Sequence, residues 1–126
     1  NVAVSERILA EFGDKIDVYS GNDELTVPIM SVGGKGVISV VSNILPAETH
    51  EMCSACLQGD FNRGTKLQIG MIELIDALFC EINPIPVKTA MEMLGLCSSE
   101  MRLPLCEMDE ENKSVLIKAL KNYGLL

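Results

Sequence analysis

A continuous β-branched run, GVISVV at residues 36–41, is the feature that most constrains how this chain can fold. Runs of this kind are typical of strands buried on both faces of a parallel sheet. A second short run, IDVYS at residues 16–20, precedes it and leads into the small polar group SGND at 20–23 and a helical stretch from about 24 to 32. The order strand, polar loop, helix, strand predicts a βαβ unit with two parallel strands.

Helical patterns lie on both sides of this unit. Residues 2–12 carry apolar side chains at helical spacing and precede Gly13, so they predict a helix. Beyond Asn43 the pattern is helical to residue 126, and the signals that start or stop these helices are Pro46, Gly59, Asp60, Pro84, Pro86 and Gly95. A last helix is predicted over 110–123, with acidic residues at its start and lysines toward its end.

One βαβ unit is too small to stand alone, because two parallel strands need further strands at their edges and helices on both faces. A (β/α)₈ barrel takes about 250 residues, and its last two strands followed by extra helices would give this order of elements. The predicted fold is therefore α/β, the C-terminal part of a TIM barrel. Residues 1–45 would form the C-terminal segment of the barrel, and residues 46–126 the last barrel helix and a C-terminal helical extension.

Composition and charge exclude several classes of partner. The net charge is -8, and the ten Lys and Arg residues are scattered singly, which argues against binding to nucleic acid or to a membrane surface. No apolar run approaches the roughly 20 residues of a spanning helix. The number of cysteines, five, is odd, and at least three of them lie within apolar helical patterns, which favours reduced thiols. We expect a soluble cytoplasmic protein.

The glycine-rich stretch VGGKGVISV, residues 32–40, raises the question of a phosphate loop. Such a loop requires the order strand, glycines, helix, with Ser or Thr after the lysine. Here a helix precedes the glycines, a strand follows them, and Lys35 is followed by Gly36. We predict instead that Gly33 and Gly34 end the helix in left-handed conformations. Lys35 would then lie at the N-terminal end of the strand, the stability side of a barrel.

The pair CSAC at 53–56, with the single histidine His50 nearby, suggests zinc binding as one interpretation. A structural zinc site needs four ligands and usually a second close pair, and the three remaining cysteines offer none. The favoured interpretation is that Cys53 and Cys56 pack in an apolar stripe with Met52 and Leu57. His50 is expected on the surface. We predict no metal and no cofactor.

In a parallel α/β fold, the site lies at the carboxyl ends of the strands. The residues at these ends are 20–23 after the first predicted strand and 38–43 in and after the second. Gly21 would let a ligand approach the backbone closely. The alternative, that SGND is only a turn and a helix cap, remains open on the chemistry alone.

Six segments occur in order along the chain: VYSGND, LTVPIMSVGGKGVISVVSNILP, FNRG, NPIPVKTAMEMLGL, MRLPL and LKNYGLL. Together they resemble the C-terminal part of the dihydrodipicolinate synthase family, over essentially the whole chain. The resemblance implies a (β/α)₈ barrel with a helical extension, and a homo-oligomer, a tetramer in most members. It also implies a lyase of lysine biosynthesis by the diaminopimelate route. In that reaction pyruvate forms a Schiff base with a barrel lysine, and the enamine condenses with aspartate semialdehyde.

The resemblance also implies roles for particular residues. The backbone of Ile38 is similar to the position that contacts bound pyruvate, and Gly21 to one that lines the same pocket. Asn22 and Asp23 stand at the pocket entrance, where the family more usually has an acidic pair. From the resemblance, substrate binding is predicted for Ile38, Gly21 and Asn22. A related class, the pyruvate aldolases similar to N-acetylneuraminate lyase, remains an alternative.

The Schiff-base lysine of the family precedes this segment, in a motif like K-E-A-S-G on the previous strand. An amine nucleophile needs a desolvated pocket or a cationic neighbour, and Lys15, Lys35 and Lys88 show no such setting. We therefore predict no catalytic residue here: the parent protein is expected to be the lyase, and the chain alone to be inactive. A second hypothesis is a non-catalytic helical module that self-associates through exposed strand edges and apolar helix faces.

Overall fold

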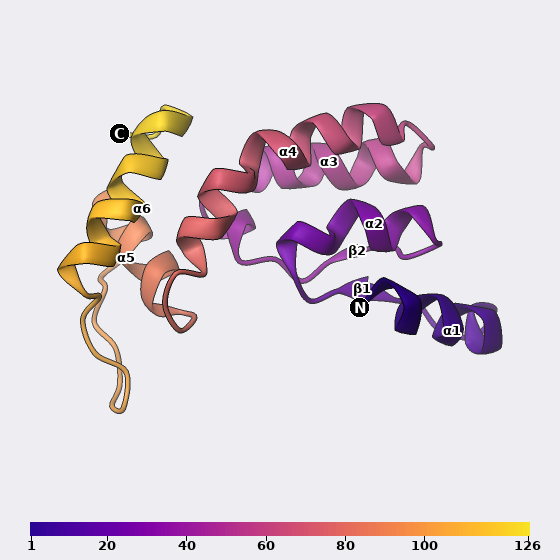
Figure 1. Ribbon diagram of the computed structural model, residues 1–126, viewed down its shortest axis with the longest axis horizontal. Coiled ribbons are helices and arrows are strands. Elements are labelled where there is room, and N and C mark those ends of the chain that lie inside the picture. The colour runs from indigo at the N-terminus through magenta and orange to yellow at the C-terminus, as the bar shows by residue number, and fades with distance from the viewer. The chain divides into compact units, whose positions relative to one another are not determined.

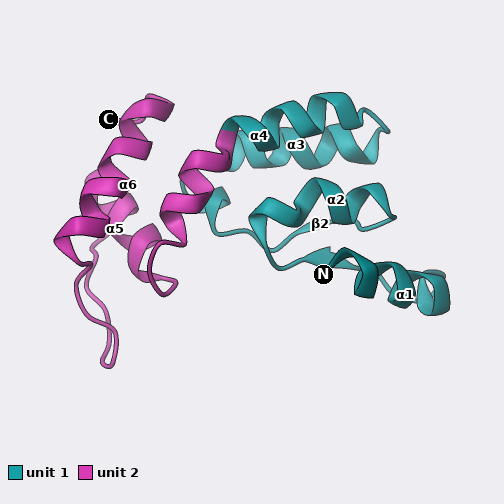
Figure 2. Ribbon diagram, in the orientation of Figure 1, with its two compact units in different colours: residues 1–70 teal, residues 71–126 magenta.

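The computed structural model describes residues 1–126. Its elements are α1 (Val2–Phe12), β1 (Tyr19–Ser20), the 3₁₀ turn η1 (Asp23–Leu25), α2 (Thr26–Ser31), β2 (Gly36–Val37), the 3₁₀ turn η2 (Val41–Asn43), α3 (Pro46–Leu57), α4 (Phe61–Leu78), α5 (Ile85–Met93) and α6 (Glu110–Tyr123) (Figure 1). The chain divides into two compact units, Asn1–Gly70 and Met71–Leu126 (Figure 2). The predicted division at residue 45 concerns the parent protein and stays a prediction.

The βαβ unit is confirmed. Strands β1 and β2 are parallel, with Tyr19 opposite Gly36 and Ser20 opposite Val37. Backbone hydrogen bonds continue the pairing on both sides, from Lys35 N to the Val18 carbonyl and from Ile38 N to the Ser20 carbonyl, each 2.8 Å.

The predicted lengths of the strands, 16–20 and 36–41, are wrong. The paired ladder covers two residues in each strand, and the second run turns into η2 at Val41. Burial on both faces is not observed either, because the Ile38 side chain is 74 % exposed and that of Tyr19 is 52 % exposed. Each strand has only one neighbour in this sheet, so the β-branched run lacks the cover that its composition predicts.

Helices α2 and α3 pack together and form the core of the first unit. Their buried apolar side chains are Val27, Ile29, Met30, Met52, Ala55 and Cys56. The start of α4 approaches α3 closely, because a Cβ on Gly64 would lie 2.5 Å from the Cys56 sulfur. Leu57, predicted in the same apolar stripe, is 61 % exposed, since it is the last residue of α3.

Most predicted helix boundaries are confirmed. Pro46 lies in the first turn of α3, and Gly59 follows that helix with a φ of 82°. The Asp60 carboxylate accepts a hydrogen bond from Arg63 N at 3.0 Å and so caps α4. Gly33 has the expected positive φ, 109°, but Gly34 does not. Close packing explains Gly34, because a Cβ there would lie 2.6 Å from the Ile29 side chain.

The second unit is helical. Its core includes Leu74 and Leu78 of α4 and Leu116 and Leu120 of α6, and α6 packs against α5. The last helix has the predicted bounds, with the Asp109 carboxylate accepting from Glu111 N at 3.0 Å at its start. Its end is fixed by Gly124 in the left-handed conformation, the usual residue for that position.

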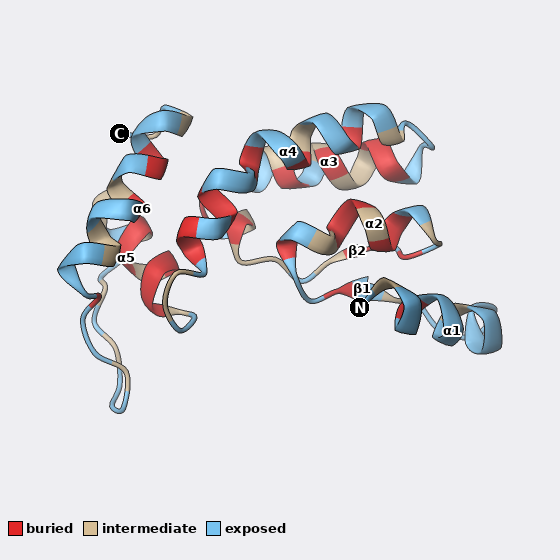
Figure 3. Ribbon diagram, viewed as in Figure 1, coloured by how far each residue is buried: buried red, intermediate tan, exposed pale blue.

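Helix α1 forms as predicted but its apolar side chains have little cover. Val4 is 50 % exposed, Ile8 37 % and Phe12 41 %, and most of the helix is exposed in Figure 3. An apolar stripe of this kind is normally stabilised by packing against another element.

None of the six α-helices is long and apolar enough to span a membrane.

Candidate functional site

The structure brings the predicted site residues together. Gly21 and Asn22 directly follow β1, and Ile38 directly follows β2. Because the two strands are parallel, their carboxyl ends lie at the same edge of the sheet. The 2.8 Å hydrogen bond from Ile38 N to the Ser20 carbonyl joins the two segments. We refer to residues 20–23 and 38–43 together as the rim.

A buried serine shapes the turn after β1. The Ser20 side chain is fully buried; its hydroxyl donates to the Asn22 carbonyl at 2.6 Å and accepts from Asn22 N at 3.2 Å. Gly21 between them is exposed, and a Cβ there would meet no atom of this chain within 4 Å. The packing of this chain therefore does not require glycine at position 21. The space beside the turn is open.

Asn22 is placed differently from the predicted cap. It precedes η1 with an extended backbone, but its side chain makes no capping hydrogen bond. The amide instead donates to Glu24 Oε1 at 3.1 Å on the exposed surface. The prediction that SGND is only a turn and a cap is thus incomplete, because the residue that makes structural hydrogen bonds is the next one, Asp23.

Asp23 joins the two segments of the rim. It is 2 % exposed, and its Oδ2 accepts hydrogen bonds from Val40 N at 3.0 Å and Val41 N at 3.1 Å. Its other oxygen, Oδ1, is buried and accepts no hydrogen bond. Sequence reasoning missed this role, because nothing in the spacing of residues 23 and 40 indicates that they meet.

The segment after Ile38 is a tight turn with its own side-chain bonds. Ser39 Oγ accepts from Ser42 N at 2.8 Å, and the Ser42 hydroxyl donates back to the Ser39 carbonyl at 3.2 Å. The Asn43 amide donates to the Val40 carbonyl at 2.9 Å. These bonds hold the backbone in η2 and leave the Ile38 side chain exposed.

A glutamine on α4 supports the helix that follows the first rim segment. Gln68 is buried, its Oε1 accepts from Val27 N at 2.8 Å, and its Nε2 donates to the Glu24 carbonyl at 2.6 Å. Val27 N lies in the first turn of α2, where a helix leaves its amides without partners, and the Glu24 carbonyl lies in η1 just before that helix. A polar residue at a core-facing position of a helix was the signal that could have found Gln68.

The cysteines and the histidine do not form a reactive cluster. Burial raises the pKa of the Cys53 thiol, and the neighbouring Cys56 and the Asp23 carboxylate raise it further. Burial likewise raises the pKa of Cys56. His50 is exposed, with its Nε2 3.4 Å from the Ser54 hydroxyl. All five cysteines are free, and no group of three or more His, Cys, Asp or Glu side chains could hold a metal ion.

The lysines lack the setting of an imine-forming amine. The exposed ones are Lys15, Lys35, Lys66, Lys118 and Lys121. Of the two half-buried lysines, Lys88 donates to the Glu100 carbonyl and Lys113 lies 3.4 Å from Glu110 Oε1. Lys35 precedes β2, so it lies at the opposite end of that strand from Ile38, as predicted.

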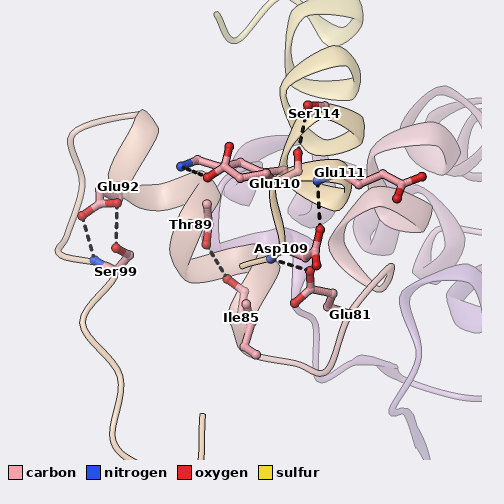
Figure 4. Close-up of polar contacts among 10 residues, drawn as sticks. Glu81, Ile85, Thr89, Glu92, Ser99, Asp109, Glu110, Glu111 and Ser114 are labelled. Carbon is pink, nitrogen blue, oxygen red and sulfur yellow. Dashed lines mark hydrogen bonds and ion pairs between the residues drawn. The ribbon is translucent and has the colours of Figure 1, made fainter. Parts of the chain in front are cut away.

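The second unit has a polar cavity lined in part by Glu92, Ser99 and Glu110. Figure 4 shows the polar contacts of these residues. The carboxylates of Glu92 and Glu110 bind the protein's own backbone and side chains. Glu92 accepts from Ser99 N at 3.2 Å and from the Ser99 hydroxyl at 2.6 Å, and these bonds lower its pKa. Near it, Glu81 accepts from Asp109 N at 2.9 Å. These contacts hold the loop between α5 and α6 rather than form a reactive site.

Known proteins that are similar to this chain point to one family. The model of the dihydrodipicolinate synthetase family matches residues 1–123. A 4-hydroxy-tetrahydrodipicolinate synthase from Methanocaldococcus jannaschii is 54% identical over 112 residues, 89% of this chain and 39% of the relative. One from Clostridium tetani is 50% identical over 113 residues, 90% of this chain and 38% of the relative.

The solved structures agree with these relatives. The crystal structure of dihydrodipicolinate synthase from Aquifex aeolicus superposes with a TM-score of 0.96 at 46% identity, covering 99% of this chain and 43% of that one. The chain thus spans about two fifths of the length of the proteins it matches. It belongs to the dihydrodipicolinate synthetase family.

Proposed function

We propose that this chain is the C-terminal part of a lyase that condenses pyruvate, bound as a lysine Schiff base, with aspartate semialdehyde in lysine biosynthesis. The observation that carries the proposal is the family match over residues 1–123 together with a rim built at the ends of two parallel strands. The named relatives favour this reaction over that of N-acetylneuraminate lyases. In the parent, β1 and β2 would be the last two strands of a (β/α)₈ barrel.

Within this proposal, the rim binds pyruvate. Gly21 offers open space beside the turn, and Ile38 presents its backbone at the same edge of the sheet. Asn22 lies at the exposed side of the turn, and we place it at the entrance of the substrate pocket. The five free cysteines fit a reducing compartment, so we place the protein in the cytoplasm.

The first test is a chimera in which this chain replaces the matched segment of the Methanocaldococcus jannaschii relative. We expect the chimera to consume pyruvate and aspartate semialdehyde, and to form a borohydride-stable adduct with pyruvate. The 126-residue chain alone should form no adduct, because its lysines are exposed or already paired. An adduct on the isolated chain, or an inactive but folded chimera, would contradict the proposal.

A pair of glycine variants separates pyruvate binding from folding. A Cβ added at Gly21 or at Gly70 would meet no neighbouring atom within 4 Å, so alanine fits this chain at both positions. In the chimera, we expect Gly21→Ala to raise the KM for pyruvate and Gly70→Ala to leave it unchanged. Equal KM values for the two variants would remove Gly21 from the pocket.

Self-association is a second candidate property, and the exposed apolar side chains of α1 favour it. Val4, Ile8 and Phe12 follow helical spacing and are 37–50 % exposed, and both strands of the sheet have an unpaired edge. We expect sedimentation of the isolated chain to show an oligomer, and Ile8→Glu to shift it toward monomer. Leu103→Glu, at a 90 % exposed position, is the matched control. A compact monomer would contradict this candidate.

A further inference from the structure

Asp23 is the only charged residue among the buried side chains of the chain, at 2 % exposure. A buried carboxylate is costly unless hydrogen bonds compensate it. Its Oδ2 receives two, from the amides of Val40 and Val41, which lie 17 and 18 residues further along the chain. The Asp23 carboxylate therefore holds these two amides in place.

The effect is on the path of the backbone after Ile38. The run GVISVV has the composition of a continuous strand, yet the ladder ends at Val37 and Val40 takes a helical conformation, φ -83° and ψ -47°. Two consecutive amides can converge on one oxygen only when the backbone bends in this way. The Asp23 carboxylate thus stabilises a bend in residues 38–41, although the β-branched residues of this segment favour an extended strand.

We propose that Asp23 is a positioning residue for the pyruvate-binding backbone of Ile38, an inference that rests on the proposed function. Ile38 is fixed at its amide by the Ser20 carbonyl, at 2.8 Å. Val40, two residues after Ile38, is fixed at its amide by Asp23. Asp23 itself follows Gly21 by two residues. One side chain thereby sets the spacing between both rim segments, without contacting the substrate itself.

Two substitutions separate this role from simple packing. Asp23→Asn keeps one oxygen that can accept from both amides, and its new amide nitrogen takes the place of Oδ1, which accepts no hydrogen bond. Asp23→Leu has a similar size and accepts nothing. Thr49→Val is the control, because it removes a buried side-chain bond, 2.8 Å from the Thr49 hydroxyl to the Leu45 carbonyl, that lies outside both rim segments.

The experiment uses the complete protein that contains this chain and measures hydrogen exchange of the peptide 36–43 together with pyruvate kinetics. For Asp23→Leu, we expect faster exchange in this peptide and a KM for pyruvate raised by about tenfold, the size expected for one misaligned hydrogen bond to a charged group. The kcat should change by less than about twofold, since binding rather than chemistry is affected. Asp23→Asn should restore most of the KM, and Thr49→Val should change neither quantity.

Several outcomes would overturn the proposal: unchanged exchange in 36–43, a kcat loss without a KM change, or equal defects in Asp23→Asn and Asp23→Leu. If Asp23→Leu raises exchange throughout Asn1–Gly70, this variant has lost the fold of the first unit. The Asp23→Asn variant then provides the test of the positioning role. That variant keeps the acceptor for both amides, so it must then leave exchange in 36–43 and the KM for pyruvate near their unsubstituted values, and a rise in either would overturn the proposal. Exchange does not depend on turnover, so an inactive complete protein would contradict the proposed function while exchange still tests the contact made by Asp23.

Discussion

The two units differ in how they hold their loops. In Asn1–Gly70 the segments near the rim are fixed by buried polar side chains that bond to distant backbone, above all Asp23 and Gln68. In Met71–Leu126 the loop between α5 and α6 is held by two carboxylates that are less buried, the half-buried Glu81 and the exposed Glu92. Buried bonds fix backbone precisely, because water does not compete for them. The difference indicates that the first unit is built to position a site and the second to pack helices.

The largest expected effect is in the core of the second unit. Leu120 on α6 is fully buried, so Leu120→Ala should lower the free energy of unfolding by about 3 kcal/mol, from lost burial and the cavity left behind. Urea unfolding of the chain measures this, with Leu103→Ala as the exposed control. A Leu120→Ala effect as small as that of the control would show that helix packing does not stabilise this unit.

An intermediate effect tests the buried polar bonds of the first unit. Gln68→Met keeps the side-chain volume but leaves Val27 N and the Glu24 carbonyl without their partner, which should cost about 2 kcal/mol. Its counterpart in the second unit is Asn122→Leu, which removes an exposed 2.8 Å bond to Glu73. That bond should contribute less than about 0.5 kcal/mol. Equal costs in urea unfolding would end the distinction between the units.

The smallest effect is the pH dependence of the loop contact made by Glu92. Ser99 lowers the pKa of Glu92 from its ordinary value of 4.5, with a smaller contribution from Lys113. A carboxyl whose folded pKa is lowered stabilises the fold above its unfolded pKa and loses that contribution as the pH falls through the folded value. The Ser99 amide resonance should therefore titrate with a midpoint below 4.5, and Glu92→Gln should abolish it. A midpoint at or above the ordinary value would contradict this.

Much of the secondary structure could be predicted from local signals. The bounds of α6 follow from the capping Asp109 and from Gly124, and the start of α3 follows from Pro46, because each acts on its own neighbours in sequence. The strand lengths could not be predicted. The β-branched residues 38–41 favour extension, but contacts from a residue 17 positions away bend them.

For the site, the sequence by itself determined where to look: parallel strands place Gly21, Asn22 and Ile38 at one edge, because chain direction fixes which ends meet. Family membership follows from sequence alone as well. Only the tertiary structure decided that Asp23 turns inward, that Asn22 turns outward to Glu24, and that Gln68 reaches the start of α2. Such side-chain bonds join residues far apart in sequence, and local propensity carries no information about which distant partner a polar group will find.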